Sequence, residues 1–322
     1  MGHNICIDEN TGKASIFVVK EPAWHGLGQV VQEALTAEEA IIQAGLDWEV
    51  VKLPIYFGDN VKIPNKYVIV RSDNNVPLGI VGKEYTPVQN RGAFSFFDDL
   101  VSKKEAIYHS AGALGKGERV WILAKLPTDI IVGRDDLINN YVLVTNTHDS
   151  SGMLMALMTP VRVVCNNTLT VAIRKATNKV LIRHTRNIHE NLRQAHELLG
   201  LSNRFRVEIQ NAFNFLSSKQ ITEKVAATIL DDLFSFRDDG GEVKRYGTKI
   251  KENILNIYGS SVGGQDMPTC RGTAFGLYNA VSFYYDNVRG YKNNDRRASS
   301  TWFGGASKVR QRAFDLIMEK VS

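Results

Sequence analysis

The residues with the clearest chemical signature in this chain are basic, and they lie in two clusters. Between Arg174 and Arg206 the sequence holds eight Lys and Arg residues against two Glu residues. A second cluster, from Arg289 to Arg312, is interleaved with aromatic residues such as Tyr291 and Trp302. Arginine suits bidentate phosphate contact, and aromatic rings offer surfaces on which unpaired bases stack. The two clusters therefore predict a single-strand nucleic-acid site.

We expect that site to be built from the basic residues of both clusters, one arginine that ends the preceding strand, and one tryptophan. The expected nucleic-acid-binding residues are Arg162, Arg174, Lys175, Lys179, Arg183, Arg186, Arg204, Arg206, Arg296, Arg297 and Trp302. The same patterns are also typical of a solvated charged face and of aromatic core residues, and this alternative stays open.

Catalytic and metal-binding patterns are weaker. His148-Asp149 follows an expected strand and Asp135-Asp136 precedes it, and strand-end carboxylates are ligands that Mg²⁺ accepts. No third ligand stands at a diagnostic spacing, and the histidines between residues 184 and 196 do not form the His-Glu-x-x-His pattern of zinc enzymes. Cys165 ends an apolar run, as buried and inert thiols do. We expect no catalytic residue, no metal and no cofactor.

Composition limits the class of protein. The chain has 322 residues, of which 43% are hydrophobic and 23% are charged, so a wholly disordered or fibrous protein is excluded. We expect neither a membrane span nor a secretory signal, because apolar runs are short and charges come early. Three distant cysteines do not suggest a disulfide framework. The predicted location is the cytoplasm.

The net charge of +5 conceals an asymmetry between the two halves. Residues 1–160 contain 14 Lys and Arg against 19 Asp and Glu, a net charge of −5. Residues 161–322 contain 25 against 15, a net charge of +10. A basic half next to an acidic one suggests an anionic partner, most commonly a nucleic acid.

The elements that would position these residues indicate an α+β fold. We expect a central curved antiparallel β-meander packed with helices, followed by a mainly helical C-terminal part. Gly115-Lys116-Gly117 is typical of a hairpin turn between the first two strands of the meander. We divide the chain into an α+β core domain, residues 1–186, and a helical region, residues 187–322, which could also pack on the core as one domain. The expected meander strands are residues 106–114, 119–126, 140–147 and 153–164.

Helices are predicted on both sides of the meander. Thr36 with Glu39 three positions later forms the pattern of a capping box at a helix start. Asn166-Asn167 is expected to end the last strand of the meander. The expected helices beyond the one at Thr36 are residues 88–102, 168–176, 205–216, 221–236, 271–288 and 306–320.

Several segments resemble the phage/plasmid-like proteins of domain-of-unknown-function family 932. The block from Thr159 to Leu169, which reads Thr-Pro-Val-Arg-Val-Val-Cys-Asn-Asn-Thr-Leu, is the most specific of them. The resemblance implies a role in the metabolism of mobile DNA but names no reaction. The other matching segments are residues 1–5, 24–28, 44–48, 85–90, 279–281 and 303–304.

A second likeness is architectural only. A curved antiparallel meander followed by a helix, with basic flanks, is similar to ring-forming single-strand annealing proteins of the eukaryotic recombination-mediator type. That likeness implies sequence-independent binding of single-stranded DNA, strand annealing in recombination or replication, and a homo-oligomer, possibly a ring. Two alternatives stay open. One is a host-directed regulatory or anti-defence binding protein, and the other is a metal-dependent nuclease that uses His148, Asp149 and Asp135.

Overall fold

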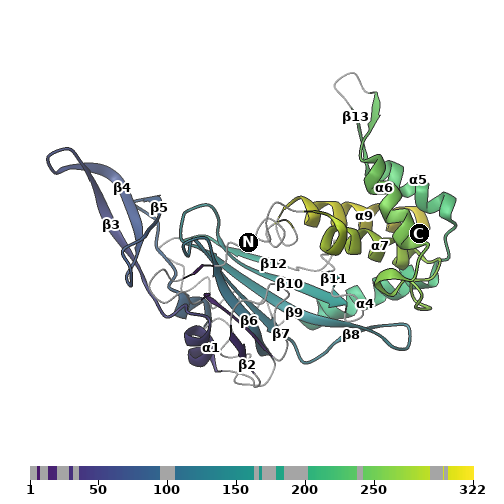
Figure 1. The fold of residues 1–322 in the computed structure, drawn as a ribbon, viewed down its shortest axis with the longest axis horizontal. Coiled ribbons are helices and arrows are strands. Elements are labelled where there is room, and N and C mark those ends of the chain that lie inside the picture. Colours follow the sequence, from purple (N-terminus) through teal and green to yellow (C-terminus); the bar gives the residue numbers. More distant parts are fainter. Residues whose placement is uncertain are drawn as a thin grey trace. The chain divides into compact units, whose positions relative to one another are not determined.

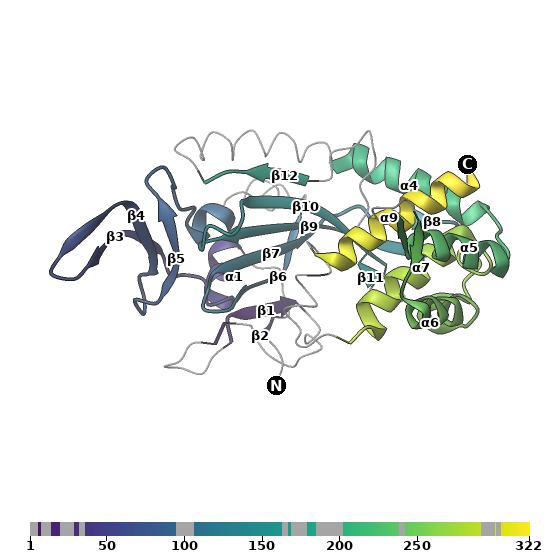
Figure 2. The same ribbon diagram turned by 90° about the horizontal axis from the view of Figure 1, so that it is seen from above.

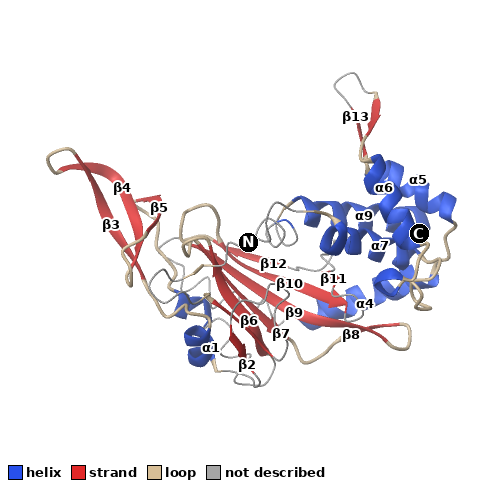
Figure 3. Ribbon diagram, viewed as in Figure 1, coloured by secondary structure: helices blue, strands red, loops and turns tan. Residues whose placement is uncertain are grey.

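The computed structural model describes residues 6–7, 14–19, 29–31, 36–94, 106–162, 167–168, 179–184, 202–237, 242–290, 300 and 304–322. Its contacts group the chain into two compact units. Unit 1 comprises Met1–Pro127, Tyr141–Met158 and Lys179–Ser202, and unit 2 comprises Thr128–Asn140, Thr159–Asn178 and Asn203–Ser322. Strands dominate the first unit and helices the second (Figure 3). The α+β class and the mainly helical C-terminal part are therefore confirmed, while the division at residue 186 stays a prediction.

The main sheet contains the predicted antiparallel meander. Strands β6, β7, β9 and β10 are neighbours in that order, and β12 pairs antiparallel with β10 (Figure 2). On the other side of β6 the sheet continues with β1 and then with β2, which runs parallel to β1. The strands are β1 (Ile16–Val19), β2 (Gln29–Val31), β6 (Ile107–Leu114), β7 (Arg119–Lys125), β8 (Ile130–Val132), β9 (Asp136–Thr147), β10 (Leu154–Arg162), β11 (Asn167–Thr168) and β12 (Lys179–Ile182).

Local sequence explains the first hairpin of the meander. Gly115 and Gly117 have φ values of 68° and 113°, which only glycine adopts at little cost. This turn sets the register that brings Gly112 opposite Trp121, and Ala111 opposite Ile122. Every residue of β9 from Asn140 to Thr147 is buried, so this strand lies at the centre of the main sheet's core.

A second, three-stranded sheet also belongs to unit 1. It consists of β3 (Val50–Phe57), β4 (Val61–Arg71) and β5 (Pro77–Gly82), paired antiparallel in chain order. The turn between β3 and β4 is the part of this sheet farthest from the main sheet (Figures 1 and 2). Helix α1 (Ala37–Gln43) precedes it and begins with the predicted capping box of Thr36 and Glu39.

Unit 2 is built mainly from helices around an aromatic core. Phe213 contacts the rings of Phe275 and Tyr278, which share one helix, and the ring of Phe314, which comes from another. A short strand pair, β13 and β14, stands between two of the helices. The elements are α4 (Ser202–Ser218), α5 (Glu223–Leu233), β13 (Ser235–Arg237), β14 (Val243–Arg245), α6 (Thr248–Tyr258), a 3-10 turn η1 (Val262–Gly264), α7 (Ala274–Phe283), a π-turn η2 (Tyr284–Val288) and α9 (Gly305–Val321).

Buried polar contacts tie parts of unit 2 that are distant in sequence. The Thr269 hydroxyl donates to the carboxylate of Asp136 at 2.6 Å, and both side chains are buried. Arg310 on α9 is fully buried and forms an ion pair with Asp286 of the π-turn. Asp136 therefore has a structural partner and is not a free carboxylate at a loop.

The structure corrects several helix predictions. The helix expected over residues 221–236 ends at Leu233, and Phe236 belongs to strand β13. The helix expected from residue 271 begins at Ala274, after the N-cap Thr273. Thr168 lies in strand β11 rather than in a helix. Helix α6, the β13–β14 hairpin and strand β8 were not predicted. Of the helix expected over residues 88–102, residues 90–94 are helical and the rest lies outside the described residues.

Candidate functional site

The structure describes only part of the predicted nucleic-acid site. Arg162 ends β10, Lys179 begins β12, and Arg204 lies in α4. Arg183 directly follows β12 and its side chain is exposed, whereas the side chain of Arg206 is half-buried. The other predicted residues lie outside the described part of the chain: Arg174, Lys175, Arg186, Arg296, Arg297 and Trp302.

Strand β12 presents an exposed face at the edge of the main sheet. Exposed and buried side chains alternate along residues 181–184, as they do in a strand with one face in the core. Leu181 and Arg183 are exposed, and Ile182 and His184 are buried. In the sheet register Lys179 stands opposite Leu157 and Ile182 opposite Leu154. Lys179 and Arg183 thus lie at the two ends of β12, and the side chain of Arg183 is exposed to solvent.

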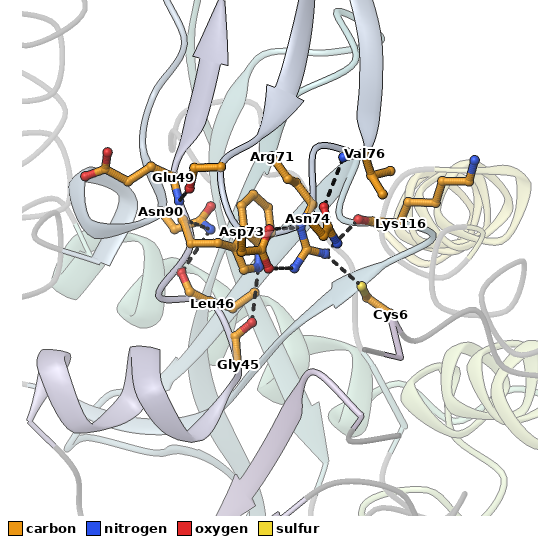
Figure 4. A network of polar contacts seen from close by, with 12 residues as sticks. Cys6, Gly45, Leu46, Glu49, Arg71, Asp73, Asn74, Val76, Asn90 and Lys116 are labelled. Carbon is orange, nitrogen blue, oxygen red and sulfur yellow. Dashed lines mark hydrogen bonds and ion pairs between the residues drawn. The ribbon is translucent and has the colours of Figure 1, made fainter. Parts of the chain in front are cut away.

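A buried arginine forms the centre of a polar network in unit 1 (Figure 4). The side chain of Arg71, at the end of β4, is only 3% exposed. Its guanidinium donates to both carboxylate oxygens of Asp73 at 3.0 and 2.6 Å, and to the carbonyl of Lys116 at 2.8 Å. It also contacts the sulfur of Cys6 at 3.2 Å and lies 4.3 Å from the ring centre of Trp48. Arg71 thereby fixes the base of the β3–β5 sheet to the β6–β7 turn.

Asn90 extends this network to His148. The Asn90 amide nitrogen donates to the carbonyls of Leu46 and Trp48 at 3.0 and 3.2 Å, so its oxygen must be the acceptor for His148. The His148 Nε2 lies 3.0 Å from that oxygen and is therefore the protonated ring nitrogen. The ring of His148 also meets the ring of Trp48 edge-on at 5.5 Å.

Burial keeps His148 neutral. Its side chain is 0% exposed, and burial lowers the pKa to about 3, with a further lowering from the nearby His184 and Arg71. Burial also lowers the pKa of His184, whose ring stacks on Tyr85 at 4.9 Å. His148 Nδ1 and both ring nitrogens of His184 are buried without a hydrogen-bond partner among the described residues.

Two residues of the nuclease alternative, His148 and Asp149, lie in this part of the structure. The Nε2 of His148 is engaged by Asn90, and Asp149 is the residue that packs against the backbone of Gly79 in β5. Within the described ranges, no group of three His, Cys, Asp or Glu side chains is placed to hold a metal ion. The network instead positions the base of the β3–β5 sheet.

The importance of Arg71 to the fold can be measured. Changing Arg71→Met should lower the free energy of unfolding by about 1.5–3 kcal/mol, because hydrogen bonds to a charged group are lost and the Asp73 carboxylate loses its partner. Urea denaturation is the measurement. The matched control is Arg91→Met, whose exposed side chain lies 3.8 Å from Glu38 and should contribute less than about 0.5 kcal/mol. Equal losses in both variants would contradict the structural role of Arg71.

Part of this network lies in a segment that resembles the family, but the sequence alone did not predict what that segment does in the fold. The segment from residue 85 to residue 90 is one of those quoted for the family resemblance. The Tyr85 hydroxyl donates to the carbonyl of Thr147 at 2.9 Å, and the Gln89 amide pairs with both backbone groups of Val50 at 2.9 Å. The polar side chains of this segment therefore bind the backbones of β9 and β3. Arg71 itself lies in none of the segments that resemble the family.

Unit 2 contains a surface pocket with a different character. It lies beside Tyr258 and has two carboxylates, Glu223 and Asp266, and one guanidinium, Arg271. The Tyr258 hydroxyl donates to the carbonyl of Ile221 at 3.1 Å, and burial together with Glu223 raises the pKa of Tyr258 to about 12. Carboxylates and a guanidinium therefore line the same pocket, and its charges are mixed.

The fold and these surfaces describe an α+β protein with an antiparallel meander, a basic edge strand and a small projecting sheet. The chain belongs to the family described as domain of unknown function (DUF932), whose model matches residues 77–302. The match begins at the first residue of β5, so β3 and β4 lie outside it. No curated protein and no solved structure matches the chain significantly. None of the helices in the described residues is long and apolar enough to cross a membrane.

Proposed function

We propose that this protein binds single-stranded DNA without sequence preference and without catalysing a reaction, and that it promotes the annealing of complementary strands. The observation that carries the proposal is the basic stretch between Arg174 and Arg206, which includes the edge strand β12 and the exposed Arg183. The proposed setting is cytoplasmic DNA recombination or replication of a mobile element, as the family resemblance suggests.

The physical basis of the proposal is phosphate contact. Annealing needs no nucleophile or metal, because the protein has only to hold one strand by its phosphates and leave the base edges free. Arginine and lysine side chains along an edge strand supply such contacts. A homo-oligomer such as a ring would place many equivalent contacts along one strand, so that modest binding by each protomer becomes strong in sum.

The test is a titration of labelled oligonucleotides of mixed sequence with the protein. Fluorescence anisotropy measures the binding, and the titration is repeated at several salt concentrations. We expect binding that weakens steeply between about 50 and 200 mM salt, since each neutralised phosphate releases counterions. Mixing complementary labelled strands with the protein should accelerate duplex formation. Absence of binding at low salt, or an affinity that salt does not change, would overturn the proposal.

Lys179 of β12 and Arg183, which directly follows it, provide the matching variant. The double change Lys179→Ala and Arg183→Ala should reduce the slope of log affinity against log salt by about 1.4, because two phosphate contacts on a single strand are removed. The control pair, Lys224→Ala and Lys249→Ala, removes the same charge from exposed positions of α5 and α6 in unit 2. An identical change of slope in the two double variants would show that only net charge matters.

A further inference from the structure

The turn between β3 and β4 exposes aromatic side chains that no described part of the protein covers. We call Tyr56, Phe57, Val61 and Lys62 the hairpin tip. Tyr56 is 52% exposed, Phe57 is 60% exposed and Val61 is 52% exposed. In the sheet register Tyr56 stands directly opposite Lys62, and Phe57 stands opposite Val61. An exposed aromatic ring beside an ammonium group is thus built into the strand pairing.

The charge around the hairpin tip favours a polyanion. From Val50 to Gly82 the chain has four Lys and Arg and two Asp, whereas the rest of residues 1–160 has ten Lys and Arg and seventeen Asp and Glu. Arg71 and Asp73 pair with each other, which leaves three lysines against Asp59. The small sheet is therefore a basic projection on the acidic half of the chain.

The base of the sheet is held by several contacts, and the tip extends beyond β5 as a two-stranded ribbon of β3 and β4. Besides the Arg71 network, the Lys52 ammonium donates to the carbonyls of Lys83 and Tyr85 at 2.7 and 2.8 Å. It also lies over the ring of Tyr67 at 4.6 Å.

We propose that the hairpin tip is a stacking site for the bases of single-stranded DNA. Tyr56 and Phe57 lie on opposite faces of the ribbon, and one base stacks on each ring, while Lys62 and Lys66 contact the adjacent phosphates. Stacking suits this role because every base has a π-face, so the contact tolerates any sequence. This inference rests on the proposed function and adds a second contact surface to it, in the same unit as β12.

The experiment compares two tip variants with the wild-type protein. Tyr56→Ala with Phe57→Ala should lower the affinity for single strands by at least about 30-fold without changing the salt slope, because two stacking contacts but no charge are removed. Lys62→Ala with Lys66→Ala should instead reduce the salt slope by about 1.4. An oligonucleotide that carries 2-aminopurine reports stacking directly, and its fluorescence change on binding should be lost in the aromatic variant.

The control is Ile80→Ala, in strand β5 of the same sheet. The side chain of Ile80 is apolar and 61% exposed, but it has no π-face. This variant should bind DNA as the wild-type protein does. Thermal unfolding of each variant shows whether it is folded.

The outcomes distinguish a failure of the stacking site from a failure of the proposed single-strand binding. If the wild-type protein binds single strands but the aromatic variant binds equally well, the stacking site is overturned and the proposed function stands. Equal weakening by Ile80→Ala, or a change in particle mass in light scattering, would identify the sheet as a protein-docking surface and would also overturn the stacking site. If the wild-type protein shows no salt-dependent binding, the proposed function fails and the stacking site fails with it.

Discussion

Replacing Arg310 by leucine is expected to lower the free energy of unfolding of unit 2 by about 3–5 kcal/mol. The Arg310 side chain is fully buried in α9, and its partner Asp286 lies 6% exposed in the π-turn. Removing only the guanidinium would leave a buried carboxylate without its counter-charge, which is the most costly way to break such a pair. Urea denaturation followed by helical circular dichroism is the measurement.

Two further variants separate the charge effect from packing. The double change Asp286→Leu and Arg310→Leu should be more stable than Arg310→Leu alone, because it leaves no unpaired charge. Lys308→Ala, at an exposed position two residues earlier in the same helix, should change the stability by less than about 0.5 kcal/mol. A double variant that is less stable than the single one would show that the pair acts through packing.

The second large effect concerns acid stability. His148 has a pKa of about 3 in the folded protein, against an ordinary value of 6.5. Between these values the unfolded chain binds one proton more than the folded chain, so stability falls as the pH falls. This part of the stability is complete above pH 6.5. From pH 6 to pH 4 the unfolding equilibrium constant should rise about a hundredfold on account of this one residue.

The variant His148→Gln isolates that contribution. Its amide nitrogen keeps a donor for the Asn90 oxygen but does not titrate in this range. Denaturation at a series of pH values should give a shallower loss of stability for the variant than for the wild-type protein. The carboxylates and His184 are present in both proteins, so their contributions to the pH dependence of stability cancel in the comparison. Parallel curves would contradict the burial of a neutral His148.

Local signals in the sequence predicted those elements whose start or turn is encoded by neighbouring residues. The capping box at Thr36, the glycine turn at Gly115 and the regular spacing of α9 all act over a few positions, and each was confirmed. Helix α6 was missed because its N-cap is Gly247, which lies in the left-handed region and provides no side-chain cap. The helix predicted to run to Phe236 ends earlier because Ser235 and Phe236 pair with β14.

The candidate surfaces were predicted less completely. Charge clusters are visible in a sequence, so the basic residues of β12 were identified, and the nucleic-acid role assigned to them stays a prediction. The Arg71 network joins Cys6, Trp48, Lys116 and, through Asn90, His148, which no sequence spacing brings together. The hairpin tip was missed because alternation indicates a half-buried strand but not which alternate positions face solvent.

The order in which strands pair has a consequence for how the chain folds. The β3–β5 sheet pairs only segments that are adjacent in sequence, so it is complete once residue 82 has been made. Strand β1, in contrast, must wait for β6, because Ile16 pairs with Gly112. Contacts between distant segments form more slowly than local ones. During synthesis the small sheet is therefore available before the main sheet that later holds its base, with its apolar residues transiently open to chaperones.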